Sequence, residues 1–434
     1  MGFLDTDRRI YALAFARMAD SIGNSFLIVV LPLYITSGVV SGGTFGLTPA
    51  IVTGVILSAF GFFNSAVQPF VGNLSDRTGK RRAFVIAGLL VLTVANFTYS
   101  LVSSYDLVFV VRIAQGVGVA LTIPATIALV NELSDDAARG GSMGVFNTFR
   151  MLGFGLGPII AGGMVHGGPY RVAGVFVSGF QAAFYVAALG SLIGAGFVYL
   201  LVSDPEAEDV DVDAGSDLSI AVLDRRDGRI LDSVFTLGLA SLFMAVGVSI
   251  VSPLEAQVNA ALDQSATMFG VEFAAFIFAQ VLLQAPIGSW SDRYGRKPFI
   301  VAGLLLLVPA TLVQGFVTTT ATMILARFVQ GIAGAAVFAP GMALAGDIAR
   351  GRSSGTTLSV LTMAFGLGTA IGPLAGGALA DVPVPVGQSY VAPFFLGAAL
   401  ALLGAFLVRS QVHETVGSGD AANERSNVDP SAAD

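Results

Sequence analysis

The sequence Gly72-Asn-Leu-Ser-Asp76-Arg77-Thr-Gly79-Lys80-Arg81-Arg82 is a short charged turn between two long apolar runs, and it occurs twice. The second copy, Gly288-Ser-Trp-Ser-Asp292-Arg293-Tyr-Gly295-Arg296-Lys297-Pro298, follows 216 residues later. Repetition at this spacing indicates that the chain consists of two copies of one unit. Gly79 and Gly295 allow a tight backbone between two helices. The cations that follow each aspartate are typical of a cytoplasmic membrane turn.

The composition is that of an integral membrane protein. Of the 434 residues, 54% are apolar and 12% are charged, and the mean hydropathy is +0.79, far from the balance of a soluble chain. The chain has no cysteine and only two histidines, so we predict no cofactor, no metal site and no enzymatic activity. We expect the lipid bilayer, a small-molecule substrate and coupling cations as partners, and no nucleic acid.

Acidic residues gather in two segments and account for the formal charge of −7. Ten of the 29 lie between residues 204 and 232, and five lie between 414 and 434. Two interpretations stay open: a hydrated surface suited to a host with high salt, or ordinary disordered acidic segments.

Apolar runs of about 20 residues, the length that crosses a bilayer core, predict an all-α membrane protein with twelve transmembrane helices in two six-helix repeats. The expected domains are a bundle at 1–202, an acidic cytoplasmic linker at 203–230, a second bundle at 231–409 and a disordered acidic cytoplasmic tail at 410–434. The expected helices are 9–36, 48–73, 82–102, 106–131, 139–165, 173–202, 231–256, 265–290, 298–318, 321–346, 354–380 and 389–409.

The positive charges predict the orientation of these helices. Of the 22 lysines and arginines, 17 fall on one side of the predicted membrane, and only Arg171 falls on the other. Because cytoplasmic loops carry the excess of lysine and arginine, we expect a multi-pass protein of the cell membrane with both termini in the cytoplasm.

Two further motifs repeat in the two halves. Arg112-Ile-Ala-Gln115-Gly116 in the fourth predicted helix corresponds to Arg327-Phe-Val-Gln330-Gly331 in the tenth. Gly153-Phe-Gly155-Leu-Gly157-Pro158 in the fifth corresponds to Gly366-Leu-Gly368-Thr-Ala-Ile-Gly372-Pro373 in the eleventh. An even number of helices in each half makes the repeats parallel in topology.

These motifs together resemble the major facilitator superfamily of transporters, over residues 9–409. The fifth-helix pattern and Asp20-Ser-Ile-Gly23, followed by Leu31-Pro32, resemble its twelve-helix drug:proton antiporter branch. The resemblance implies a monomeric secondary active transporter. Its expected activity is proton-coupled efflux of small lipophilic or amphiphilic compounds by alternating access, and sodium stays open as the coupling ion.

Charged side chains within the predicted helices are the candidates for coupling, because a charge at mid-helix costs about 2.5–3.5 kcal/mol even on the lower scales. Asp20 is the predicted proton carrier, since burial raises the proton affinity of a carboxylate and a nearby arginine lowers it. The alternative is a permanent structural pair with Arg17, one turn away. The candidates for proton coupling are Asp20, Arg112, Arg150, Glu272 and Arg327.

Helix depths predict partners for these charges. At about 1.5 Å per residue, Asp20 and Arg150 lie at similar depth, and so do Glu272 and Arg327. We therefore expect these two pairs to meet. The resemblance to antiporters also implies a coupling role for Arg112.

The resemblance further implies charge networks at the two repeated turns, where they would form a conformational latch. We expect Asp76 and Arg77 to interact with Glu132, and the equivalent residues of the second half to do the same; the alternative is plain solvated charge at helix ends. The predicted latch residues are Gly72, Asp76, Arg77, Gly79, Lys80, Arg81, Glu132, Gly288, Asp292, Arg293, Gly295, Arg296 and Asp347.

Small residues and prolines in the fifth and eleventh helices predict close packing and hinge bending. These residues are Gly153, Gly157, Pro158, Gly162, Gly372, Pro373 and Gly376. The amides Asn24, Gln115, Asn147, Gln284 and Gln330 are candidates for the substrate cavity, although glutamines in helix bundles equally serve to bridge helices.

Two other functions stay open. Three buried arginines suit an anion, so the first alternative is a transporter of a specific metabolite such as an organic anion, a sugar or an amino acid. The second is a membrane sensor that no longer transports.

Overall fold

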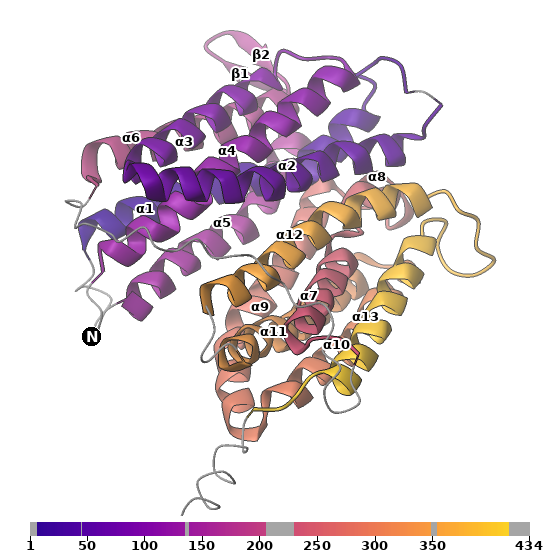
Figure 1. Cartoon of the computed structure of the whole chain (residues 1–434). Coiled ribbons are helices and arrows are strands. Elements are labelled where there is room, and N and C mark those ends of the chain that lie inside the picture. Colours follow the sequence, from indigo (N-terminus) through magenta and orange to yellow (C-terminus); the bar gives the residue numbers. More distant parts are fainter. Residues whose placement is uncertain (1–6, 45, 135–138, 205–229, 349–353, 416–434) are drawn as a thin grey trace, which may run out of the picture.

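The structure is a computed structural model that describes residues 7–44, 46–134, 139–204, 230–348 and 354–415. Its helices form two bundles, one from each half of the chain (Figure 1). Within the described residues, twelve helical segments are long and apolar enough to cross a membrane. The predicted all-α membrane fold is confirmed. Most of the predicted linker at 203–230 (residues 205–229) and of the predicted tail at 410–434 (residues 416–434) lies outside the described residues.

The first half consists of six helices and a β-hairpin. Its elements are α1 (Arg8–Thr36), α2 (Pro49–Thr78), α3 (Arg81–Thr98), α4 (Tyr105–Glu132), α5 (Arg139–Gly167), β1 (Tyr170–Val172), β2 (Val175–Val177) and α6 (Gly179–Leu201). The strands pair antiparallel, with Tyr170 opposite Val177. We call the end of the bundles that carries this hairpin the hairpin end. The opposite end, which carries the turns at 72–82 and 288–298, is the arginine-rich end.

The second half repeats the six spans, with the seventh span of the chain divided into three pieces. Its elements are α7 (Ser233–Ser249), η2 (Ser252–Leu254), α8 (Glu255–Ala261), α9 (Ala266–Tyr294), α10 (Arg296–Leu312), η3 (Val313–Gly315), α11 (Thr320–Ile348), α12 (Ser354–Leu379) and α13 (Ala392–Gln411).

Two predicted boundaries were wrong for identifiable reasons. The sixth helix begins at Gly179 and not at 173, because Ala173 and Gly174 have φ angles of 49° and 85° and form the hairpin turn. Ser178 then starts the helix with a capping box. The seventh helix is interrupted at Pro253, which cannot donate a backbone hydrogen bond, and continues to Ala261 instead of ending near 256.

The predicted packing glycines lie at helix contacts. A Cβ at Gly157 would overlap the hydroxyl of Ser25 on α1, and a Cβ at Gly372 would overlap the hydroxyl of Ser249 on α7. The two serines therefore occupy equivalent places in the two halves. Gly153 and Gly376 likewise lie against backbone carbonyls of α1 and of the segment after α7. Glycine permits this close approach because small residues let helix backbones come together.

The two halves meet near the hairpin end, where α2 packs on α12 and α5 packs on α9. Gly54 lies against the carbonyl of Pro373, and Gly270 lies against the carbonyl of Pro158. The largest apolar core contains residues of both halves, among them Leu31 from α1 and Phe269 from α9. Three further cores each lie within one half. Away from the hairpin end the bundles diverge (Figure 1).

Candidate functional site

A buried charge cluster lies in the first half, on α1 and α5. Arg17 forms an ion pair with Asp20 on the same face of α1, and the two side chains are only 9% and 4% exposed. Asp20 Oδ1 is buried and accepts no hydrogen bond within the described residues. Arg150 Nε donates to Asn147 Oδ1 at 2.9 Å. Because α1 packs closely on α5, the cluster combines one carboxylate with arginines from two neighbouring helices.

The predicted pairing of Asp20 with Arg150 was therefore wrong, and the alternative pair with Arg17 is the one that the structure shows. Arg17 lies one helical turn from Asp20 and reaches the carboxylate along its own helix. Arg150 turns toward Asn147, one turn away on α5, although it is near enough to Arg17 for the two positive charges to repel. The other amide candidates, Asn24 and Gln284, are half-buried.

Arg112 belongs to a buried hydrogen-bond network that joins α3 and α4. Arg112 Nη1 donates to Gln115 Oε1 at 3.0 Å, and the hydroxyl of Tyr99 donates to the same oxygen at 2.9 Å. Gln115 Nε2 donates to Asn96 on α3 at 2.6 Å. The guanidinium lies over the ring of Phe60, 4.5 Å from its centroid.

Arg327 occupies the equivalent place in the second half. Its Nη1 donates to Gln330 Oε1 at 2.6 Å and to the Val248 carbonyl at 3.2 Å. Gln330 Nε2 donates to the Thr311 hydroxyl on α10 and to the Gly247 carbonyl on α7. Gln115 and Gln330 thus bridge helices, one of the two roles left open by the sequence, and both are fully buried.

We expect Gln330→Leu to lower the free energy of unfolding by about 1–3 kcal/mol, because the substitution removes the acceptor of the buried Arg327 Nη1 and the donor to the buried Thr311 hydroxyl. Thermal unfolding of the detergent-purified protein measures this as a lower Tm. Gln284→Leu is the control, since Gln284 is half-buried; equal Tm values for the two variants would contradict a structural role for Gln330.

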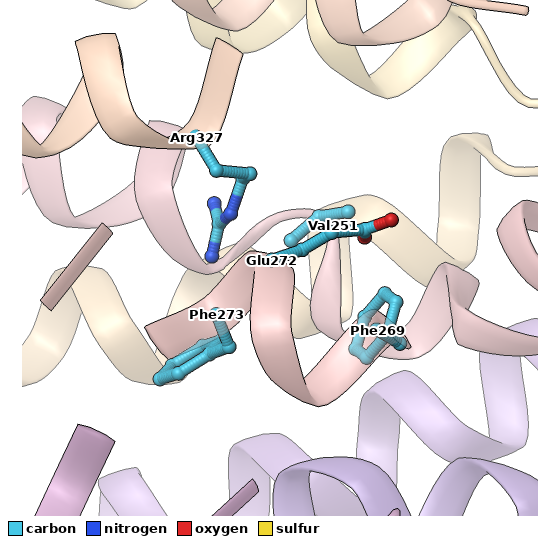
Figure 2. Close-up of a pocket in the computed structure, with 5 residues that line it drawn as sticks. All are labelled: Val251, Phe269, Glu272, Phe273 and Arg327. Atoms are coloured by element: carbon cyan, nitrogen blue, oxygen red, sulfur yellow. The ribbon is translucent and has the colours of Figure 1, made fainter. Parts of the chain in front are cut away.

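Glu272 lies near Arg327 in the second half, as expected from their depths. Within the described residues, however, the two side chains do not form an ion pair. Both side chains line one small pocket with Val251, Phe269 and Phe273, and Figure 2 shows the carboxylate directed away from the guanidinium. Glu272 Oε1 accepts instead from Gln264 Nε2 at 2.7 Å. Arg327 is held by Gln330 and the α7 backbone, which turns it from Glu272.

Glu255, which the sequence analysis did not select, is a second buried carboxylate in this region. It begins α8, is 0% exposed, and neither of its carboxylate oxygens accepts a hydrogen bond from a described residue. It lies near enough to Glu272 for the two charges to repel. The hydroxyl of Tyr390 is also buried, and burial next to the charge of Glu272 raises the pKa of Tyr390 to about 12.

The sequence contained one signal for Glu255. The apolar run continues beyond Glu255 through Ala260-Ala-Leu262, so a longer seventh span would have placed this acid inside the membrane. Within the described residues, no three metal-ligating side chains gather into a group.

At the arginine-rich end of the first half, Arg81 joins three helices. It forms ion pairs with Asp76 at 3.2 Å and with Glu132 at the end of α4. The predicted network named Arg77 as the bridging cation, which was wrong. Arg77 lies on an exposed face of α2, whereas Arg81 starts α3 after the left-handed turn at Gly79 and points toward α4.

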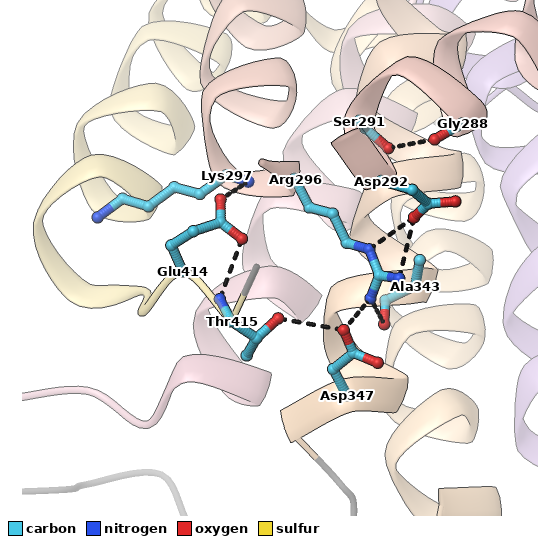
Figure 3. Close-up of polar contacts among 9 residues, drawn as sticks. All are labelled: Gly288, Ser291, Asp292, Arg296, Lys297, Ala343, Asp347, Glu414 and Thr415. Carbon is cyan, nitrogen blue, oxygen red and sulfur yellow. Dashed lines mark hydrogen bonds and ion pairs between the residues drawn. The ribbon is translucent and has the colours of Figure 1, made fainter. Parts of the chain in front are cut away.

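The second half has the same network, with Arg296 in place of the expected Arg293. Arg296 binds Asp292 at 2.9 Å and forms further contacts with Asp347 and the Ala343 carbonyl on α11 (Figure 3). Arg293 is exposed. Each network therefore joins helices of one half. The side chains of Asp76 and Asp292 are still 67% and 56% exposed.

Two acids outside the predicted latch complete these networks. The carboxylate of Glu414, after the last helix, accepts from the Lys297 backbone N–H at 2.8 Å, and Thr415 binds Asp347 (Figure 3). In the first half, Asp204 after α6 accepts from the Arg82 backbone N–H at 2.7 Å. These carboxylates cap the free N–H groups at the starts of α10 and α3.

Comparison with known proteins identifies the family. Residues 13–234 and 237–430 match the Major Facilitator Superfamily, so the chain belongs to this superfamily, whose fold is that of transporters. The quinolone resistance protein NorA of Staphylococcus aureus (strain MSSA476) is 23% identical over 93% of this chain and 96% of its own length. Multidrug resistance protein 1 of Bacillus subtilis (strain 168) is 33% identical over 40% of this chain, but the match spans only 43% of that relative.

Solved structures agree with this fold. A bacterial homologue of the human lysosomal transporter Spinster, in an inward-facing and occupied conformation, has a TM-score of 0.74 at 15% identity and covers 92% of this chain and 95% of its own. The nucleoside transporter NupG has a TM-score of 0.68 at 14% identity, with coverage of 93% and 98%. The predicted resemblance to the superfamily and to its drug-resistance members is confirmed.

Proposed function

We propose that this membrane transporter exports small lipophilic or amphiphilic compounds in exchange for protons, by alternating access of a site between its two halves. The names of its multidrug and quinolone resistance relatives support the substrate class. The observation that carries the coupling is the buried Asp20, which has one ion-pair partner and one carboxylate oxygen without a donor among the described residues.

Asp20 is suited to bind and release a proton because its proton affinity depends on the positive charges of two neighbouring arginines. Arg17 neutralises it, while Arg150 adds a second positive charge to the cluster. A movement of α1 against α5 changes the distance from Asp20 to Arg150, and with it the affinity of Asp20 for a proton. Such a group binds a proton in one conformation and releases it in another.

The arrangement of the halves corresponds to an inward-facing state in this proposal. The halves are in contact at the hairpin end and share an apolar core there. The concentration of lysine and arginine favours a cytoplasmic position for the arginine-rich end and both termini. Substrate would therefore enter from the cytoplasm, and Asp76 and Asp292, exposed in this state, would form contacts when that end closes.

Export of an organic anion is the second candidate, and Arg150 favours it. This half-buried guanidinium forms no ion pair with a carboxylate within the described residues. Arg112 and Arg327 favour it less, because their guanidinium groups already donate to glutamines and lie against aromatic rings.

Substrate-driven proton movement in proteoliposomes that contain a pH-sensitive dye tests the proposal. We expect lipophilic cations or neutral drugs to drive proton flux through the wild type, and Asp20→Asn to reduce the flux to the level of empty liposomes. If organic anions drive the flux and lipophilic compounds do not, the second candidate replaces the first.

The double variant Arg17→Gln/Asp20→Asn separates coupling from structure. Asp20→Asn alone leaves Arg17 buried without its partner, which destabilises the fold, whereas the double variant removes both charges. We expect the double variant to remain folded, by gel filtration and Tm, and still to lack coupled flux. Normal coupled flux in the double variant would reduce the ion pair to a structural role.

A further inference from the structure

The second half contains two buried carboxylates whose charges are not satisfied. Glu255 and Glu272 are 0% and 2% exposed, and three of their four carboxylate oxygens accept no hydrogen bond from a described residue. The fourth accepts from Gln264. Asn259 lies one turn beyond Glu255 on α8 and accepts from Gln264 Nε2 at 3.1 Å, so Gln264 contacts both α8 and Glu272. Unpaired buried charges are costly, so this arrangement requires a further ligand.

Charge balance identifies that ligand as a single positive charge. Two ionised carboxylates and the nearby guanidinium of Arg327 sum to −1, and one added proton brings the cluster to zero. Like charges in one buried site favour retention of a proton by one of them. That proton leaves one of the two carboxyl groups neutral and removes the repulsion between them. We infer that Glu255 and Glu272 form a proton-binding pair that holds one shared proton near the hairpin end.

The surroundings favour a proton over a metal cation. The pocket that holds Glu272 is lined by the apolar side chains of Val251, Phe269 and Phe273 and by Arg327, whose positive charge repels a cation. The oxygens nearby that are not carboxylates belong to the amides of Asn259 and Gln264. The other titratable group that faces the pair is Tyr390, from the segment before α13. α12 ends near Asp381, which is exposed and lies in the adjoining cavity.

The internal repeat shows that this pair is specific to the second half. Ser25 and Ser249 are equivalent, as are Gly54 and Gly270. Counting from these positions aligns Glu255 with Leu31 and Glu272 with Ile56, both buried and apolar. The same count aligns Asp20 with Met244. Acids are thus placed at different depths in the two halves, Asp20 toward the arginine-rich end and the glutamate pair toward the hairpin end.

A cavity lies beside α8 at the hairpin end. It has a volume of about 480 Å³ and lies between the halves, lined by Ala256, Gln257 and Ala260 of α8 and by Thr36 and Thr48 of the first half. Glu255 is the neighbour of Ala256 in the same short helix. In this proposal the cavity is the route by which a proton approaches the pair from the hairpin side.

Infrared difference spectroscopy of the purified protein tests this inference, and it needs no substrate. We expect the wild type to show a carboxylic acid C=O band that is lost as pH rises. Glu255→Gln and Glu272→Gln should each abolish this band, while Asp20→Asn should retain it. A band unchanged in both glutamate variants would overturn the pair, and a titration displaced by Na⁺ would overturn the proton as its ligand.

Chemical labelling of the wild type keeps the test valid if a variant fails to fold. Dicyclohexylcarbodiimide reacts with protonated carboxyl groups in apolar surroundings, and mass spectrometry locates the product. We expect label on Glu255 or Glu272, with a yield that falls as pH rises; absence of label at both positions across the pH range would refute the inference. The role of the pair in transport rests on the proposed function, but both measurements are independent of transport.

Discussion

Arg296→Ala is expected to reduce transport roughly tenfold and to lower the Tm of the purified protein, because charge-assisted hydrogen bonds are worth about 1.5–3 kcal/mol and this side chain makes several. Arg296 holds the ends of α9 and α11 together through Asp292, Asp347 and the Ala343 carbonyl. Its side chain is only 14% exposed, so water does not replace these contacts fully. Flux assays in proteoliposomes and thermal unfolding in detergent measure the two effects.

Arg293→Ala is the matched control for this prediction. Arg293 precedes Arg296 by one turn, carries the same charge and lies on an exposed face, so its removal should alter either quantity little. Asp76→Ala adds a second comparison in the first half. Asp76 is 67% exposed, and its removal should impair transport with little loss of stability, as expected for a residue that forms its main contacts in another conformation. Equal defects in Arg293→Ala and Arg296→Ala would contradict the assignment of the network.

Gly270→Val is expected to abolish transport while the helices stay inserted. A Cβ at Gly270 would overlap the backbone carbonyl of Pro158 in the other half. Because backbone atoms cannot rotate away, the branched side chain must push α5 and α9 apart, and overpacking of this kind costs about 1–3 kcal/mol or more. Gly54→Val should behave in the same way, since Gly54 lies against the carbonyl of Pro373.

Labelling of a single cysteine shows whether the halves have separated. The chain has no cysteine, so Gln257→Cys in the cavity at the hairpin end provides a unique site for a membrane-impermeant maleimide. We expect faster labelling when Gly270→Val is present. Gly163→Val is the control, because a Cβ at Gly163 meets no atom within 4 Å. Unchanged labelling together with normal flux in Gly270→Val would show that the two halves do not need this close contact.

Much of the architecture was predictable because it rests on simple physical constraints. Apolar length gives the spans, and the repeated turns with the paired motifs around Arg112 and Arg327 give the two halves. The predictions failed where a single residue alters the backbone. Pro253 divides the seventh span, and Ala173 with Gly174 turns the expected start of the sixth helix into a hairpin.

Partners of charged side chains were less predictable than helices. Depth along a helix placed Asp20 beside Arg150, but it does not tell which way a long side chain turns, and Arg17 reached Asp20 first. Similarly, Arg77 and Arg81 are the same residue type in the same charged turn. The turn at Gly79 decides that Arg81, and not Arg77, points toward Glu132. Glu255 was missed because its burial depends on a helix that continues after a break.

The apolar core shared by both halves affects the equilibrium between states in which the hairpin ends are together and states in which they are apart. Separating the hairpin ends would expose residues such as Leu31, Ile56 and Phe269, all at most 2% exposed here, so the empty protein has a population weighted toward the state in which they remain buried. Reversing such a weighting from 1:99 to 99:1 takes about 5.5 kcal/mol of preferential binding. In the proposed mechanism, cargo and protons together supply that preference, and a compound that binds both states equally well would occupy the site without being moved.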